Sequence, residues 1–233
     1  MDFALFNVDG ILFLLRWVHF LAGITWIGLL YYFNFVQGEF FKEIEAGPKN
    51  VAISKLVPRA LWWFRWSAMV TFIVGILLVT GTMHTGIPLK SSWGVLILIG
   101  GILGTVMWAN VWFIIWPNQK VVIASATQVL GGGQPIADAA ARGARAGLAS
   151  RTNVLFSIPM LFFMGAARHL LIPRDFSTVN LMPLAIILGA IVLLLEINAL
   201  KGKLGPLATV KGVIHMGVLL TAVFYVVVEL TTR

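Results

Sequence analysis

The chain has 233 residues, of which 59% are hydrophobic and 11% are charged, and its mean hydropathy is +0.93. Soluble domains carry about 25% charged residues, so this composition excludes an ordinary soluble domain. The formal net charge is +8. The basic residues fall in short segments between apolar runs, which is typical of membrane orientation and not of nucleic-acid binding. The lack of cysteine excludes disulfides, thiolate-ligated iron–sulfur clusters and covalently attached c-type haem.

Six apolar runs are long enough to cross a bilayer, since a membrane helix needs about 20 predominantly apolar residues. In chain order they cover residues 11–37, 62–82, 93–116, 152–172, 179–200 and 210–230. These runs predict an all-α integral membrane protein, with residues 1–233 forming a single polytopic membrane domain. The expected architecture is a bundle of about six transmembrane helices in a lipid bilayer.

Lysine and arginine are unevenly shared among the connections between these runs. The first, third and fifth connections are basic, and hold Lys42, Lys49, Lys55, Arg59, Lys120, Arg142, Arg145, Arg151, Lys201 and Lys203. The positive-inside rule then predicts that these connections are cytoplasmic and that both termini are periplasmic, in the inner membrane of a bacterium. We expect the long cytoplasmic loop 117–151 to contain one short interfacial helix over residues 136–149.

The first run carries four residues that can serve a haem. Arg16, His19, Gly23 and Trp26 follow a 3-4-3 spacing, so they share one face of a helix. Histidine is the commonest ligand of haem iron, glycine lets a macrocycle approach the backbone, tryptophan packs on the ring, and arginine pairs with a propionate. Ordinary helix packing and interface anchoring explain the same stripe.

His169 ends the fourth run beside Arg168. A helical rise of about 1.5 Å per residue puts His19 and His169 at comparable depth, on the periplasmic side of the midplane. The two histidines are therefore the predicted metal ligands, one on each face of a single haem b. Arg16 and Arg168 are the predicted propionate partners.

The other polar residues in the runs suit structural roles. His84 falls near the headgroups and His215 has no histidine at matching depth; each belongs to a second site or to ordinary packing. Arg65 and Glu196 lie near predicted cytoplasmic ends, where side chains snorkel to water. Asn110 is expected to form a hydrogen bond between helices. Almost none of the nine acidic residues is intramembrane, which argues against a proton pump built on buried acids.

Several stretches resemble the membrane domain of PuuD-type urate hydroxylases. They are residues 16–28 (RWVHFLAGITWIG), 110–120 (NVWFIIWPNQK), 150–153 (SRTN) and 157–164 (SIPMLFFM). The first stretch also resembles membrane protoporphyrinogen oxidases and copper-resistance membrane proteins. The resemblance implies a membrane redox domain whose electrons leave through a cytochrome c domain.

Because the chain contains no cysteine, we expect its electrons to pass to a separate cytochrome c or into a larger membrane redox complex. The leading hypothesis is a membrane-embedded haem b electron-transfer protein, with urate oxidation as its most specific form. The alternative is a non-catalytic membrane subunit of a larger redox or respiratory complex. A small transporter is the third hypothesis. No residue is assigned a catalytic role.

Overall fold

The structure, a computed structural model, describes residues 3–170 and 172–233, and every regular element in that part of the chain is helical. The longer helices are α1 (Val8–Tyr31), α2 (Gly38–Glu43), α3 (Ala46–Lys55), α4 (Val57–His84), α5 (Ser92–Ala109), α6 (Trp116–Leu130), α7 (Ala139–His169), α8 (Met182–Lys201) and α9 (Val210–Thr231). Two π-helical segments, η2 (Tyr32–Gln37) and η3 (Asn110–Ile115), join α1 to α2 and α5 to α6. Short 3₁₀ turns, η1 (Ala4–Phe6) and η4 (Gly205–Ala208), precede α1 and α9.

Six helical runs of the described chain are long and apolar enough to cross a membrane. They are Val8–Glu43, Val57–His84, Ser92–Leu130, Ala139–His169, Met182–Lys201 and Val210–Thr231. The predicted all-α, multi-pass membrane bundle is therefore confirmed. Each of the six predicted apolar runs overlaps one of these helical runs.

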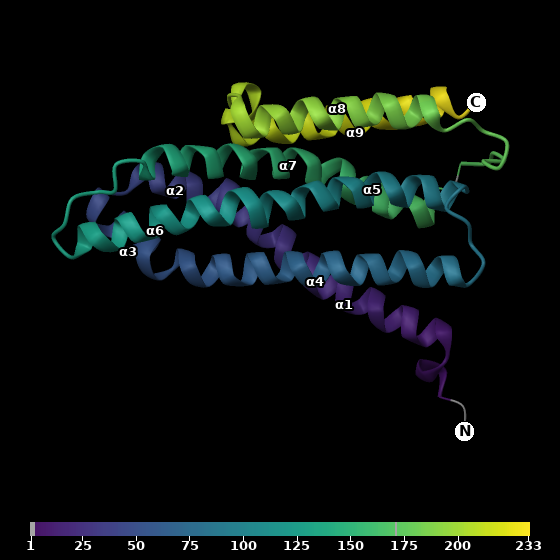
Figure 1. Cartoon of the computed structure of the whole chain (residues 1–233), viewed down its shortest axis with the longest axis horizontal. Helices are drawn as coiled ribbons and strands as arrows, with labels where there is room; N and C mark the ends of the chain where they lie inside the picture. Colours follow the sequence, from purple (N-terminus) through teal and green to yellow (C-terminus); the bar gives the residue numbers. More distant parts are fainter. Residues whose placement is uncertain (1–2, 171) are drawn as a thin grey trace.

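Helix α7 lies at the centre of the bundle (Figure 1). It packs against α5 and α6 on one side, against the α8–α9 hairpin on another, and touches α1 and η2 as well. Most of its apolar stretch is buried, whereas less than a third of the apolar stretches of α1, α4, α8 and α9 is buried. Those outer helices expose apolar side chains because lipid, and not water, is the solvent around them.

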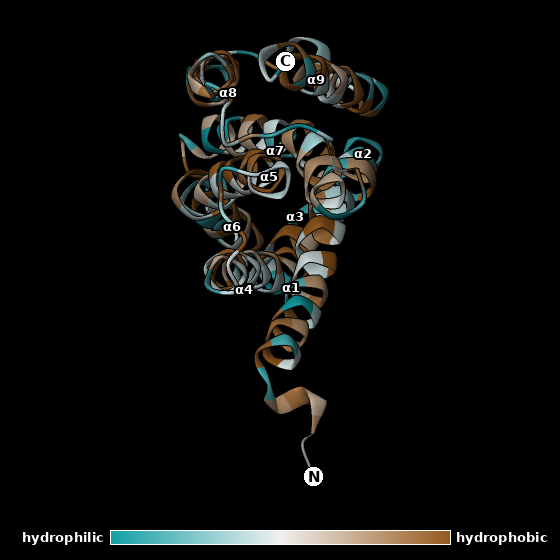
Figure 2. Ribbon diagram, turned by 90° about the vertical axis from the view of Figure 1, so that its right-hand side faces the viewer, coloured by the Kyte–Doolittle hydropathy of each residue, from teal (hydrophilic) through white to brown (hydrophobic). Residues whose placement is uncertain are grey.

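Helix α1 is tilted relative to the rest of the bundle. Its principal neighbour is α4, and its N-terminal part leans away from the layer that contains α7 (Figures 1 and 2). Most residues of its N-terminal half are exposed, and its largest buried side chains are Trp26, Ile27 and Leu30. The tilt separates the outer part of α1 from the central helix.

Two of the spanning runs are much longer than a bilayer requires. The continuous run α5–η3–α6 has 39 residues, which corresponds to about 58 Å at helical rise, against a hydrocarbon core of about 30 Å. The excess forms a helical extension beyond the turn between α8 and α9, built from α2, α3, the end of α6 and the start of α7 (Figure 1). Contacts of α3 and α7 with α6 hold the extension together.

The expected loop 117–151 is mostly helical. α6 continues to Leu130 and α7 begins at Ala139, so the separate interfacial helix predicted over residues 136–149 is wrong, because most of these residues form the first turns of α7. Hydropathy detects only the apolar part of a helix. The alanines and arginines of this segment are good helix formers, and they prolong α7 out of the apolar region.

Both termini lie at one end of the bundle (Figure 1). The first, third and fifth connections lie toward the opposite end, as the alternation of basic loops predicts. The assignment of that basic end to the cytoplasm stays a prediction from charge.

Gly100 lies at a close contact between α5 and α7. A Cβ atom added there would lie 3.2 Å from the carbonyl oxygen of Met160 and 3.3 Å from the backbone nitrogen of Met164. Backbone atoms in two packed helices cannot yield as a flexible side chain would. The neighbouring Gly101 has open space around its Cα.

We expect Gly100→Ala to destabilise the protein by about 1–3 kcal/mol, because the added methyl overpacks the contact between α5 and α7. Gly101→Ala is the matched control, and it should leave stability unchanged or raise it by up to about 1 kcal/mol, since alanine is the better helix former. Thermal unfolding of the detergent-purified variants measures both. Equal stability of the two variants would contradict this packing.

Candidate functional site

The two π-helical segments give the bundle its most unusual backbone. The backbone N–H of Gly38 donates to the oxygen of Phe33, and that of Trp116 to the oxygen of Val111, five residues back in each case. π-helical turns are rare in proteins, and many of those that occur are found at functional sites. Each segment contains one buried asparagine, Asn34 in η2 and Asn110 in η3.

Both asparagines reach the same face of α7. Ser150, Asn153 and Ser157 are spaced three and four residues apart, so they share one side of this helix, and we call them the α7 polar stripe. Asn153 and Ser157 have no exposed surface. Polar side chains buried in a membrane bundle need partners inside the protein, and here the partners come from η2 and η3 and the helix turns just before them.

On the η3 side, the amides form a directed chain. The Asn153 Nδ2 donates to the carbonyl oxygen of Met107 at 2.9 Å, which turns the Asn153 Oδ1 toward Asn110. The Asn110 Nδ2 then donates to that Oδ1 at 3.0 Å and to the Glu196 Oε2 of α8, also at 3.0 Å. The helix–helix hydrogen bond expected for Asn110 is confirmed, and it joins three helical runs.

On the η2 side, the Asn34 Nδ2 donates to the Ser150 Oγ and to the oxygen of Leu30, both at 2.8 Å. One turn earlier in α1, the Tyr31 hydroxyl lies 2.9 Å from the Ser157 Oγ. α7 is thus hydrogen-bonded on two sides by helices that each change their winding at the point of contact.

Two arginines near the basic end also have specific neighbours. The Arg151 Nη2 lies 3.3 Å from the Glu39 Oε1, which ties α7 to α2. The Arg65 guanidinium carbon lies 3.8 Å from the ring centroid of Trp116. Arg65, which was expected to snorkel, stacks on an aromatic ring of the next helical run, which is a favourable contact for a planar cation.

Two of the predicted haem residues of α1, His19 and Gly23, face α4. A Cβ at Gly75 of α4 would lie 3.2 Å from the His19 Cε1, so the imidazole rests directly on the backbone of α4. A Cβ added to Gly23 would lie 3.9 Å from a methyl carbon of Thr71, which also belongs to α4. His19 and Gly23 therefore share the face that the spacing predicts.

The His19 Nδ1 is buried and has no hydrogen-bond partner in the described structure. Trp26 is also buried, and its Nε1 lacks a partner as well. Arg16 is exposed on the same helix. The α1–α4 contact thus contains an enclosed imidazole, close to the backbone of Thr71, and the lone pair of a neutral imidazole nitrogen is what an iron ligand needs.

His169 and Arg168 are the last two residues of α7, and both are exposed. Within the described residues, no hydrogen bond joins either of them to α1, and no group of three or more histidine or acidic side chains is placed to hold a metal ion. The structure does not bring His169 against His19. Their pairing on one haem stays a prediction.

The comparison with known families decides the relationship of the chain. Residues 84–224, more than half of its length, match the family model described as urate oxidase N-terminal. The chain belongs to this family. Searches of curated proteins and of solved structures gave no match.

The matched range contains the whole of the α7 polar stripe together with Asn110 and Glu196, and it ends within α9. α1 lies outside it, with Arg16, His19, Gly23 and Trp26. The family resemblance drawn from residues 110–120 and 150–153 is confirmed, and the structure brings these two stretches together through the hydrogen bond between Asn110 and Asn153.

Sequence reasoning missed the partners Tyr31, Asn34 and Ser157. Each sits in an apolar run, where hydropathy marks the run and not the single polar residue. The polar residues in the stretches 110–120 and 150–153 were the available signal of contacts between helices, because asparagines inside apolar helices require a partner.

We expect Asn34→Ala to destabilise the protein by about 1–3 kcal/mol, because the part-buried Ser150 then loses the amide that donates to it and the oxygen of Leu30 loses a second donor. Thr25→Ala, in the same helix, is the control, since the Thr25 hydroxyl bonds to the oxygen of Leu21 in its own helix. Unfolding in a mixed-detergent titration compares the two. A loss from Asn34→Ala no larger than that from Thr25→Ala would show that the contact between η2 and α7 contributes little.

Proposed function

We propose that this chain is a membrane-embedded redox protein of the urate hydroxylase type in the bacterial inner membrane. It binds haem b and passes electrons to a separate cytochrome c or into a larger redox complex. The observation that carries the proposal is the buried, unpartnered His19 Nδ1 in a multi-pass protein of the urate oxidase N-terminal family. Urate is the substrate that the family's name suggests.

The residues of α1 fit a haem ligand set in part. His19 offers a buried nitrogen without a partner, and leaving such a group unsatisfied costs about 1–3 kcal/mol. The absence of a side chain at Gly75 lets the imidazole lie directly on α4, and Gly23 lies one turn further along the same face of α1. Bound haem would supply one-electron transfer, and His19 and Trp26 are the residues of α1 that would hold it.

The second ligand is the less supported part of the proposal. His169 would hold the opposite face of the iron, with Arg16 and Arg168 next to the propionates. Arg16, Arg168 and His169 are exposed in the structure, Arg16 in the N-terminal half of α1 and the other two in the last turn of α7. Their exposure leaves them free to reorient toward a ligand, whereas His19 is already enclosed.

A second candidate function is that of a non-catalytic membrane subunit. The helical extension of α2, α3, α6 and α7 projects past the length that a bilayer covers. It exposes large apolar side chains, with Phe40 at 50%, Val51 at 44% and Leu130 at 44%. Such side chains outside the lipid favour contact with a partner protein.

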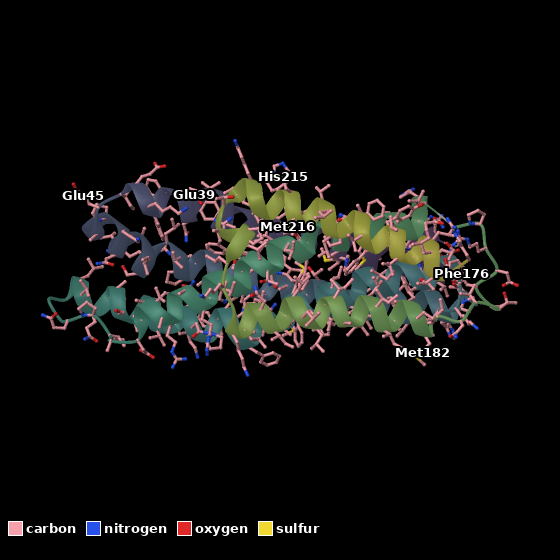
Figure 3. All side chains as sticks on the ribbon, turned by 90° about the horizontal axis from the view of Figure 1, so that it is seen from above. Glu39, Glu45, Phe176, Met182, His215 and Met216 are labelled. Atoms are coloured by element: carbon pink, nitrogen blue, oxygen red, sulfur yellow. The ribbon has the colours of Figure 1, made fainter. Side chains whose placement is uncertain are left out.

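A dithionite-reduced minus oxidised visible spectrum of the detergent-purified chain tests the redox proposal. We expect the α-band of a b-type haem, and we expect His19→Ala and His169→Ala each to lose most of the bound haem because an axial ligand is removed. His215→Ala is the control, since His215 is exposed on α9 and its side chain is directed outward (Figure 3).

A folded, colourless protein expressed with ample haem would overturn the haem proposal and favour the subunit function. Full haem content in both His19→Ala and His169→Ala would overturn the ligand assignment alone. Loss of haem in His19→Ala but not in His169→Ala would mean that the second ligand comes from elsewhere.

A further inference from the structure

One acidic residue, Glu196, lies along a membrane-spanning helix of the bundle and not in a connection between helices. Glu196 belongs to α8, about 21 Å along the helix axis from Met182 and about 8 Å before Lys201. Lys201 is at the basic end of the bundle. The carboxyl group is therefore within the hydrocarbon region, in the third nearest the basic end.

The side chain of Glu196 has a hydrogen-bond partner inside the bundle. Its Oε2 accepts a hydrogen bond from the Asn110 Nδ2 at 3.0 Å, and the residue is half-buried. Snorkelling, which was expected for this residue, does not include this contact. The amide of Asn110 offers the carboxyl group a donor between the helices, about 8 Å before the end of α8.

No positive charge accompanies this carboxyl group. In the described structure Glu196 takes part in no ion pair. On α7, the arginine closest in sequence to Asn153 is Arg151, and it is paired with Glu39. On the other neighbouring elements, Lys201 of α8 and His215 of α9 are exposed to the surroundings.

Within residues 3–170 and 172–233, one side chain donates to Glu196, and its orientation depends on a backbone oxygen. The Met107 oxygen orients Asn153, and Asn153 orients Asn110, so one N–H of Asn110 is committed to Asn153 and the other points at Glu196. An ionised carboxylate in hydrocarbon needs a counter-charge or several donors. One neutral amide N–H is a suitable partner for a carboxyl group that gains and loses a proton.

We propose that Glu196 is a proton-binding site of the membrane domain. The carboxylate takes up one proton, forming an O–H bond at Oε1, the oxygen that Asn110 does not contact, and releases it by the reverse step. Protons reach it from the basic end of the bundle, about 8 Å away along α8. The site needs neither haem nor urate, so its failure and the failure of the proposed function are distinguishable.

Dicyclohexylcarbodiimide tests the proposal, because this apolar reagent adds to protonated carboxyl groups in the membrane and leaves a stable N-acylurea. The full chain in phospholipid vesicles is treated over a range of pH, and the adduct is located by peptide mass spectrometry. We expect the adduct on Glu196, in an amount that falls as the pH rises. Glu229, which is paired with Arg174, and Glu39 should stay unmodified.

Two variants complete the experiment. Glu196→Gln keeps an acceptor for Asn110 and should abolish the adduct, whereas Glu43→Gln changes an exposed residue of α2 and should leave the labelling of Glu196 intact. If Glu196→Gln does not fold, the pH dependence of labelling in the unaltered chain still decides. An unmodified Glu196, labelling that does not depend on pH, or equal labelling of Glu196 and Glu229 would overturn the proposal.

Discussion

The hydrogen bond between Asn110 and Asn153 fixes how the central helix sits in the bundle. Both side chains are buried, at 1% and 0% exposure. In this environment no water can replace a lost partner, so each amide must find its donors and acceptors within the protein. The bond joins η3 to α7, and because Met107 orients Asn153, the bond favours the register in which these two side chains meet.

The remaining polar contacts follow from that register. Once α7 is placed, Ser150 and Ser157 present hydroxyls to Asn34 and Tyr31, so η2 packs on a second side of the same helix. Glu196 of α8 then accepts a hydrogen bond from the second N–H of the Asn110 amide. The bundle therefore has two chemically distinct regions. One is the polar interior around α7, and the other is the α1–α4 contact that contains His19.

The six spans could be predicted from hydropathy, because each has enough apolar residues to cross the bilayer. The helical extension could not, since the polar segment 117–151 reads as a loop although it forms the end of α6 and the start of α7. The shared face of His19 and Gly23 follows from helical spacing alone. The pairing of His19 with His169 used depth alone, and depth does not include the tilt of α1 away from α7 (Figure 2).

The direction of Glu196 was unpredictable for a similar reason. Its partner, Asn110, is 86 residues away in the sequence, and no local pattern indicates whether a carboxyl group near a helix end turns outward or inward. The family-like stretches were more informative. Their asparagines and serines form hydrogen bonds between helices, so the stretches on which the resemblance rests also connect the helices of the bundle.

A double-mutant cycle on Asn110→Ala and Asn153→Ala tests most directly whether this hydrogen bond positions α7. Unfolding free energies are measured in mixed detergent for the unaltered chain, both single variants and the double variant. Our account predicts that the two effects are coupled by about 0.5–3 kcal/mol. The effect of Asn153→Ala should instead add to that of Thr25→Ala, which lies in a separate contact. Additive effects of Asn110→Ala and Asn153→Ala would contradict the account.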